Sequence, residues 1–176
     1  MLWDFAGYSI DETFHGLASM GPPLVSDAGE HLARLLMRDA QPEHINRAAL
    51  FWKQALEDRS LAPEAFRGFG WWSQVEDLDQ DRWEQMTLKT CERAQGTLNF
   101  PIEVAERCLR EPTTAEGLRI LTRLLRGQHE PWERARVAEI AISALRASSS
   151  ETAPAETRDG LRATLTDLGY FDATDL

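Results

Sequence analysis

Three aspartates at alternate positions, Asp77, Asp79 and Asp81, come nearest in this sequence to a spacing that could do chemistry. Carboxylates spaced in this way open the calcium loop of EF-hand proteins, where they converge on one Ca²⁺ ion. The rest of that loop is missing, because Arg82 stands where its turn needs glycine and Leu88 stands where it needs a bidentate glutamate. We therefore expect no metal at these aspartates.

The same acidic run has a simpler interpretation as the start of a helix. Asp79 or Asp81 can accept hydrogen bonds from the free backbone amides of a first helical turn. Asp81 and Glu84 also have the spacing of a capping box. The run therefore predicts a helix that begins close to Asp81.

The residue types that carry catalysis lack the spacing that catalysis needs. The four histidines lie on separate segments, so a zinc site would have to be assembled in three dimensions: His15, His31, His44 and His129. The sequence contains no HExxH pair, no GxSxG nucleophile turn and no GxxxxGK[ST] phosphate loop. We predict a protein that is not an enzyme, with no catalytic residue, no cofactor and no bound metal.

Cys91 and Cys108 are the only two cysteines, and each lies within an amphipathic helical pattern. This placement favours buried thiols in a reducing compartment over a disulfide or a metal ligand. The N-terminus has no basic segment followed by an apolar one, and no window reaches the ~18 apolar residues of a membrane span. We expect a cytoplasmic protein that does not bind membranes.

The net charge of −10 disfavours nucleic acid as a partner, because a phosphate backbone repels an acidic protein. The charge is unevenly distributed. Residues 107–146 contain eight arginines and five glutamates, hence +3, whereas the rest of the chain carries −13. A protein partner is the remaining expectation for a chain of this kind.

Three of these arginines, Arg119, Arg123 and Arg126, recur at i, i+4 and i+7, opposite the leucines of the same predicted helix. We call them the arginine ridge. A solvated helix face would explain them, and so would a docking surface for an acidic partner or an acidic neighbouring domain.

The stretch FRGFGWW, residues 66–72, holds four of the large aromatic side chains. Phe66, Phe69 and Trp72 keep to one broad helical face, which predicts a role in the core. Trp71 points off that face, and we predict that it marks a junction with a neighbouring unit or a partner. The two glycines of the stretch weaken a helix by about 0.5–1 kcal/mol each relative to alanine, so we expect a close helix contact or an early helix end there.

Apolar residues follow helical spacing almost throughout, and no run shows the alternation of a strand. The chain is therefore predicted to be all-α. The expected helices cover residues 11–20, 28–38, 42–60, 63–75, 81–94, 101–111, 115–126, 131–147 and 157–168. Ser26 and Thr114 are expected N-caps, and the segment 21–23, Gly-Pro-Pro, is expected to break any helix. Gly96, Gly127 and Gly169 should end helices.

Short connections at intervals of about 15–20 residues require antiparallel neighbours. Units of about 35–40 residues predict stacked hairpins in a HEAT-like α-α superhelix, with an irregular helical bundle as the alternative. We expect residues 1–25 to form a weakly structured or short-helical N-terminal segment. Residues 26–176 should form one helical-repeat domain with a small, polar, mobile loop at 148–156.

The order of several short elements resembles a known family. These elements are Phe51-Trp52, Leu61-Ala62-Pro63-Glu64, Phe69-Gly70-Trp71-Trp72, Asp81-Arg82-Trp83, Pro101-Ile102-Glu103-Val104-Ala105, Pro131-Trp132 and Leu168-Gly169-Tyr170-Phe171. Over about residues 40–176 they resemble the C-terminal helical region of large bacterial ATP-binding proteins of the STAND or NACHT-like type. The resemblance implies a HEAT-like array associated with sensing or with defence against phage. The nucleotide-binding module of that family is missing here, so ATP binding is not implied.

Two functions follow as expectations. The first is a protein-interaction, scaffold or sensor module, whose candidate partner-binding residues are the arginine ridge and Trp71. The second is a small acidic immunity or anti-defence protein that neutralises a cationic partner, since opposite charge accelerates association.

Overall fold

The protein is all-α over the residues that its structure, a computed structural model, describes: 22–38, 40–109 and 113–170. No strand occurs within these ranges, which confirms the predicted fold class. In chain order the elements are α2 (Pro22–Arg38), α3 (Pro42–Glu57), the 3₁₀ helix η2 (Pro63–Gln74), α4 (Gln80–Arg93), α5 (Pro101–Cys108), α6 (Ala115–Arg126), α7 (Pro131–Ala147) and α8 (Ala155–Asp167).

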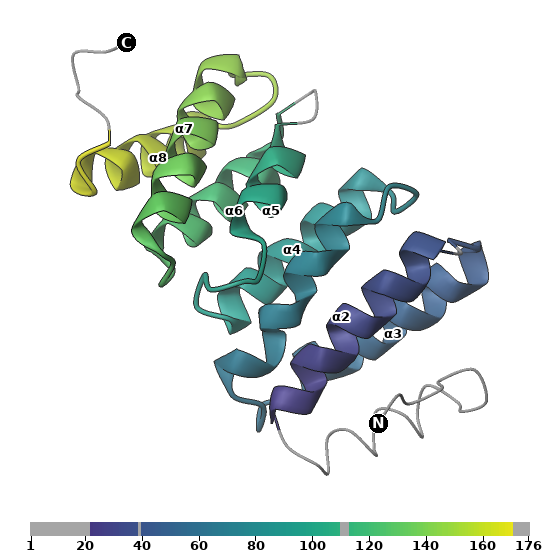
Figure 1. Cartoon of the computed structure of the whole chain (residues 1–176). Coiled ribbons are helices and arrows are strands. Elements are labelled where there is room, and N and C mark those ends of the chain that lie inside the picture. Colours follow the sequence, from purple (N-terminus) through teal and green to yellow (C-terminus); the bar gives the residue numbers. More distant parts are fainter. Residues whose placement is uncertain (1–21, 39, 110–112, 171–176) are drawn as a thin grey trace.

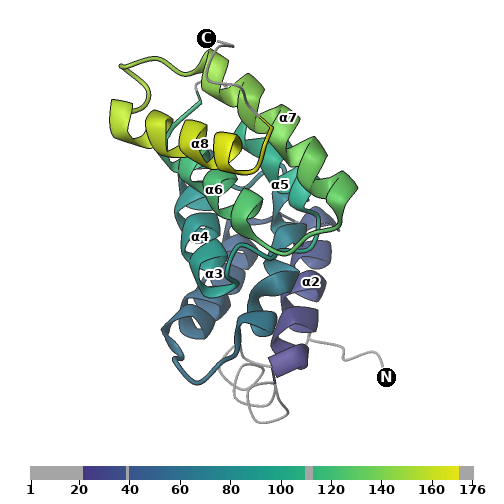
Figure 2. The same ribbon diagram turned by 90° about the vertical axis from the view of Figure 1, so that its left-hand side faces the viewer.

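The helices pack in two rows. In the first row α2 contacts η2, η2 contacts α5, and α5 contacts α7. In the second row α3 contacts α4, α4 contacts α6, and α6 contacts α8. Each helix of the first row also packs against its successor in the chain, which lies in the second row. The hairpins α2–α3 and α7–α8 lie at opposite ends of the molecule, with α4, α5 and α6 between them (Figures 1 and 2).

Proline begins five of these elements, since its missing N–H is free in a first helical turn anyway. Four of the five starts agree with the sequence, and one does not. The prolines at 22 and 23 begin α2, so this helix starts six residues before the expected position. The expected break after residue 20 lies outside the described residues. Ser26 is not its cap, because it lies inside α2 as the fifth residue; its Oγ accepts a hydrogen bond from the amide of Gly68 at 2.8 Å. The predicted helix at 11–20 lies outside the described residues.

Side-chain caps are found at two predicted positions. Asp79 accepts a hydrogen bond from the Arg82 amide at 2.9 Å and so caps α4. Thr114 accepts one from the Gly117 amide at 3.0 Å and so caps α6. The capping-box interpretation of Asp81 and Glu84 is wrong, because Asp79 is the N-cap and Asp81 is already the second residue of α4.

The glycines that end helices do so in two ways. Gly96 and Gly169 have positive φ, as expected of a residue just past a helix end. Gly127 ends α6 with an ordinary φ of −70°. Glycine is needed there for space, because a Cβ would overlap the carbonyl oxygen of Gly96 in the α4–α5 connection.

The connection before α8 is shorter than predicted, since α8 begins at Ala155. Its turn is closed by a hydrogen bond from the Ala153 amide to the Ser149 carbonyl, 3.0 Å long. Ala153 is buried, so the middle of the connection packs against the molecule.

The aromatic core is built around η2. In a 3₁₀ helix every third residue lies on one line, and Phe66, Phe69 and Trp72 are all fully buried on such a line. Trp52 of α3 packs against all three rings, with ring centroids 5.1–6.4 Å apart. Trp83 of α4 is also fully buried, as its helical stripe predicted. At about 25 cal/mol per Å², one such side chain contributes about 5 kcal/mol before entropy.

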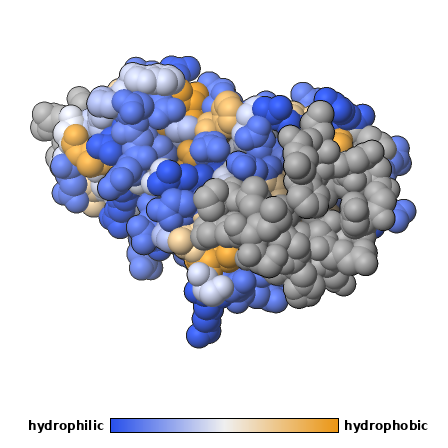
Figure 3. Space-filling model, turned by 60° about the horizontal axis from the view of Figure 1, so that its bottom comes forward, coloured by the Kyte–Doolittle hydropathy of each residue, from blue (hydrophilic) through white to orange (hydrophobic). Residues whose placement is uncertain are grey.

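On the face shown in Figure 3, the coloured part of the surface is mostly polar, with a few hydrophobic patches. Over the described residues, no helix has the length and apolar character needed to cross a membrane.

Candidate functional site

The arginine ridge lies along the exposed side of α6. Arg119, Arg123 and Arg126 are all exposed, whereas the leucines of the same helix are buried. The buried side of α6 meets the neighbouring helices of both rows. The ridge therefore belongs to the outer surface of the second row.

Two ridge arginines form ion pairs with glutamates of the same surface. Arg119 lies 3.6 Å from Glu116, one turn earlier in α6, and Arg123 lies 3.6 Å from Glu92 of α4. The four side chains are each about half exposed. Ion pairs in such contact with water contribute only about 0–1 kcal/mol, so they can exchange for the carboxylates of a partner.

The third ridge arginine reaches the next helix of the row. Arg126 donates a hydrogen bond to the Thr164 hydroxyl of α8 at 3.0 Å. A similar bond joins α4 to α3, where Arg82 donates to Asn46 at 2.7 Å. Together with the pair between Arg123 and Glu92, these bonds link α3, α4, α6 and α8 along the surface of the second row.

Trp71, predicted to mark a junction with a neighbouring unit or a partner, lies where three elements of the first row meet. It is only half-buried, while the adjacent Trp72 is fully buried. The Arg34 guanidinium of α2 lies 4.4 Å above its ring, and the Phe100 ring, just before α5, meets it edge-on at 4.3 Å. Trp71 thus bridges three successive elements of the first row. The structure does not bring it together with the arginine ridge, which lies in the second row.

Phe100 holds a strained conformation in this contact. Its φ of +56° lies in the left-handed region, which a bulky residue adopts at a cost of about 1–3 kcal/mol. Pro101 follows it and disfavours helical backbone at the residue before. Two contacts help to hold this turn in place: the ring contact with Trp71, and a hydrogen bond of 2.9 Å from the Asn99 backbone N–H to the Arg67 carbonyl.

A buried polar network, which the sequence did not reveal, joins η2, α4, α5 and α6. The buried Glu84 carboxylate accepts hydrogen bonds from the side-chain Nε2 of Gln80 at 2.9 Å and from the Thr114 hydroxyl at 2.7 Å. Gln80 in turn accepts a bond from the guanidinium of Arg107, which is only 3% exposed. The sequence held one signal of this network: Glu84 directly follows the core residue Trp83, in a helix that packs on two sides.

Both cysteines are buried free thiols, as the sequence predicted. Burial raises the pKa of Cys91 to about 12, and it also raises the pKa of Cys108 well above the ordinary range. The Cys108 thiol donates to the Val104 carbonyl at 3.3 Å. Neither thiol is a nucleophile near neutral pH, because both remain protonated.

Trp132 is the large apolar side chain with the highest exposure among the described residues, at 65%. It is the second residue of α7, directly after Pro131. Its position could have been predicted, since it lies on the side of α7 opposite the buried stripe of Val137 and Ala144. Large exposed aromatic residues are common at the centres of protein interfaces.

Within the described residues, no group of three or more His, Cys, Asp or Glu side chains could hold a metal ion. The chain matches no protein-family model, no curated protein and no solved structure.

Proposed function

We propose that the chain is a non-enzymatic protein-interaction module, a scaffold or sensor, that binds an acidic segment along the arginine ridge. The observation that carries this proposal is the exposure of three arginines in one line, held only by half-exposed ion pairs and one hydroxyl. Arg119 and Arg126 are seven residues apart, which on a helix is about 10 Å. Two or three carboxylates of an extended or helical partner can span that length.

The contacts of the helices support a HEAT-like α-α superhelix as the frame of this module. Helices alternate between two rows along the chain, and each contacts the next member of its own row. Arrays of this kind present long surfaces to partners. Association with a bacterial STAND-type defence or signalling system rests on the sequence resemblance alone and is the finer part of the proposal.

The test is affinity capture from the source cells with three baits. These are the unaltered protein, the variant Arg119→Glu/Arg123→Glu/Arg126→Glu, and a control with Arg136→Glu/Arg146→Glu on α7. Both control arginines are exposed, and they lie in the other row. The ridge variant should lose the partner and the control should keep it, because only the ridge variant repels the partner's carboxylates. Full retention by the ridge variant would remove the ridge from the function.

An acidic inhibitor of a cationic partner is the second candidate. It is supported by the net charge of −10 and by four exposed carboxylates before and at the start of α4: Glu76, Asp77, Asp79 and Asp81. Under this alternative the Glu variant of the ridge should bind at least as tightly as the unaltered protein. Raising salt from about 50 to about 500 mM should slow association on the order of tenfold or more. An affinity that does not change with ionic strength would exclude an inhibitor of this type.

A further inference from the structure

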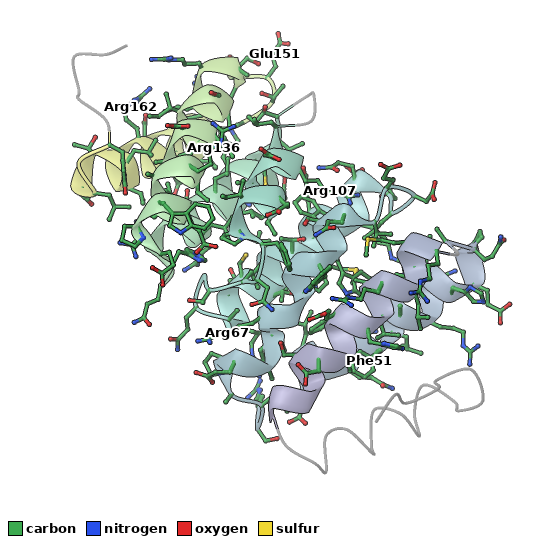
Figure 4. All side chains as sticks on the ribbon, viewed as in Figure 1. Phe51, Arg67, Arg107, Arg136, Glu151 and Arg162 are labelled. Carbon is green, nitrogen blue, oxygen red and sulfur yellow. The ribbon has the colours of Figure 1, made fainter. Side chains whose placement is uncertain are left out.

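Arg107 clamps the end of η2 from the next helix of its row. Its guanidinium donates to the carbonyls of Trp72 and Ser73 at 3.3 and 3.1 Å, which belong to the last turn of η2. It also donates to the carbonyls of Val75 and Leu78, at 2.6 and 2.7 Å, in the connection that follows. Carbonyls at a helix end carry partial negative charge and have no partner inside the helix. One arginine therefore satisfies the end of η2 and the turn after it, in the middle of the molecule (Figure 4).

Arg93 does the same at the end of α3. It donates to the carbonyl of Leu56, in the last turn of α3, at 2.6 Å. It also donates to the carbonyls of Asp58 and Leu61, at 2.7 and 3.3 Å, in the connection to η2. Arg93 is the last residue of α4, the helix that follows α3 in the second row.

Each guanidinium also lies over an aromatic ring of the element between the two that it joins. Arg93 lies 4.6 Å from the ring centre of Phe66 in η2, and Arg107 lies 4.9 Å from that of Trp83 in α4. Both rings belong to the fourth residue of their helix. The same three-part contact thus occurs twice, once in each row, and both rings are fully buried.

The chemistry of arginine explains why this contact fixes an angle. The guanidinium is flat and carries five N–H donors in fixed directions, so several carbonyls and a stacked ring define its orientation. The side chain begins at one helix, ends at a second and stacks on a third. A change in the angle between these elements would break several charge-assisted hydrogen bonds, and those of Arg107 lie in a buried environment.

We propose that Arg93 and Arg107 are joint residues that set the angles between successive elements from α3 to α5, and with them the shape of the surface that the array presents. The device is independent of the arginine ridge, whose side chains point to solvent. It predicts that replacement of either arginine loosens the array even where the protein stays folded.

The experiment compares Arg107→Lys and Arg93→Lys with the control Arg136→Lys, whose arginine makes half-exposed ion pairs with Glu106 and Glu139. Lysine keeps the charge but cannot make the forked contacts. Spin labels on Lys53→Cys in α3 and Gln85→Cys in α4 report on the Arg93 joint. Labels on Arg67→Cys in η2 and Glu103→Cys in α5 report on the Arg107 joint. Both native cysteines are buried, so the labels go to the introduced ones.

We expect the distance distribution across the affected joint to broaden and the melting temperature of Arg107→Lys to fall by about 10 °C, with little change in Arg136→Lys. Distance distributions that stay as narrow as those of the unaltered protein would overturn the proposal. If Arg107→Lys does not fold, the same distance measurement on Arg93→Lys tests the proposal. The Arg93 side chain is only half-buried, so its replacement should leave the protein folded.

Discussion

At the scale of single residues, the contacts of His129 give the protein a pH dependence. Its Nε2 lies 3.0 Å from the Gly96 carbonyl oxygen, between the α4–α5 and α6–α7 connections, where the neutral ring can donate a hydrogen bond. Burial is the main cause that lowers the pKa of His129 below its ordinary value near 6.5. The hydrogen bond to Gly96 and the negative charge of Glu133 partly oppose this lowering of the pKa, and the positive charge of Arg134 adds to it.

The sign of the effect follows from this direction. Below about pH 6.5 the unfolded chain binds a proton at His129 more readily than the folded protein does, so stability falls as the pH is lowered. The contribution of the neutral His129 ring to stability is fully present above about pH 6.5. It is lost progressively as the pH falls from there to the pKa of the folded state. We expect the unfolding free energy to drop less between pH 7.5 and 5.5 in His129→Gln than in the unaltered protein, as measured by urea denaturation. Equal losses in both proteins would show that His129 is not responsible.

At the scale of elements, two glycines allow η2 to lie where it does. A Cβ on Gly68 would overlap the Ser26 carbonyl of α2, and a Cβ on Gly70 would overlap the Asn99 carbonyl before α5. The sequence predicted either a close helix contact or an early helix end at these glycines, and a close approach of neighbouring backbone is found on both sides of η2. Close backbone contact thus ties the aromatic core to the strained turn at Phe100.

Gly70→Ala should therefore destabilise the protein by about 3 kcal/mol or more, since the obstacle is backbone and cannot rotate away. Gly160→Ala in α8 is the matched control. A Cβ on Gly160 meets nothing within 4 Å, so its higher helix propensity should stabilise the protein by about 0.5–1 kcal/mol. Chemical denaturation measures both, and similar values for the two variants would rule out the close approach as the reason for Gly70.

The helices could be predicted from the sequence wherever local signals decide them. Pro131 and the stripe from Val137 to Leu145 predicted the bounds of α7 as they are found. The 3₁₀ form of η2 could not be predicted, because both helix types place residues i and i+3 on one side. Which of the two helix types forms depends on contacts with residues more than 25 positions away, such as Ser26 and Asn99.

The candidate site was predictable only in its local part. Helical spacing predicted that the three ridge arginines share an exposed face, and they do. Their acceptors Glu92 and Thr164 come from other helices, so no spacing within α6 could reveal them. The buried carboxylate of Glu84 was missed for the same reason, since Thr114 reaches it from the next hairpin.

At the scale of the whole molecule, arginines have two different placements, one between the helices and one on the surface. The buried Arg107 and the half-buried Arg93 join helix ends between the two rows, and exposed arginines line one side of the array. In a chain of net charge −10, the arginine ridge is a line of three exposed positive charges, and the proposed binding of an acidic segment rests on this contrast. Binding there should be local, weak in high salt and confined to the second row.

Titration of the ¹⁵N-labelled protein with a peptide of eight glutamates, followed through the arginine Nε–Hε signals, tests whether the ridge is a binding surface. We predict saturable shifts at Arg119, Arg123 and Arg126 in about 50 mM salt, and their loss in the variant Arg119→Gln/Arg123→Gln/Arg126→Gln. Signals of Arg136 and Arg146 should stay in place. Unmoved ridge signals, or shifts of equal size at Arg136 and Arg146, would contradict the proposed function.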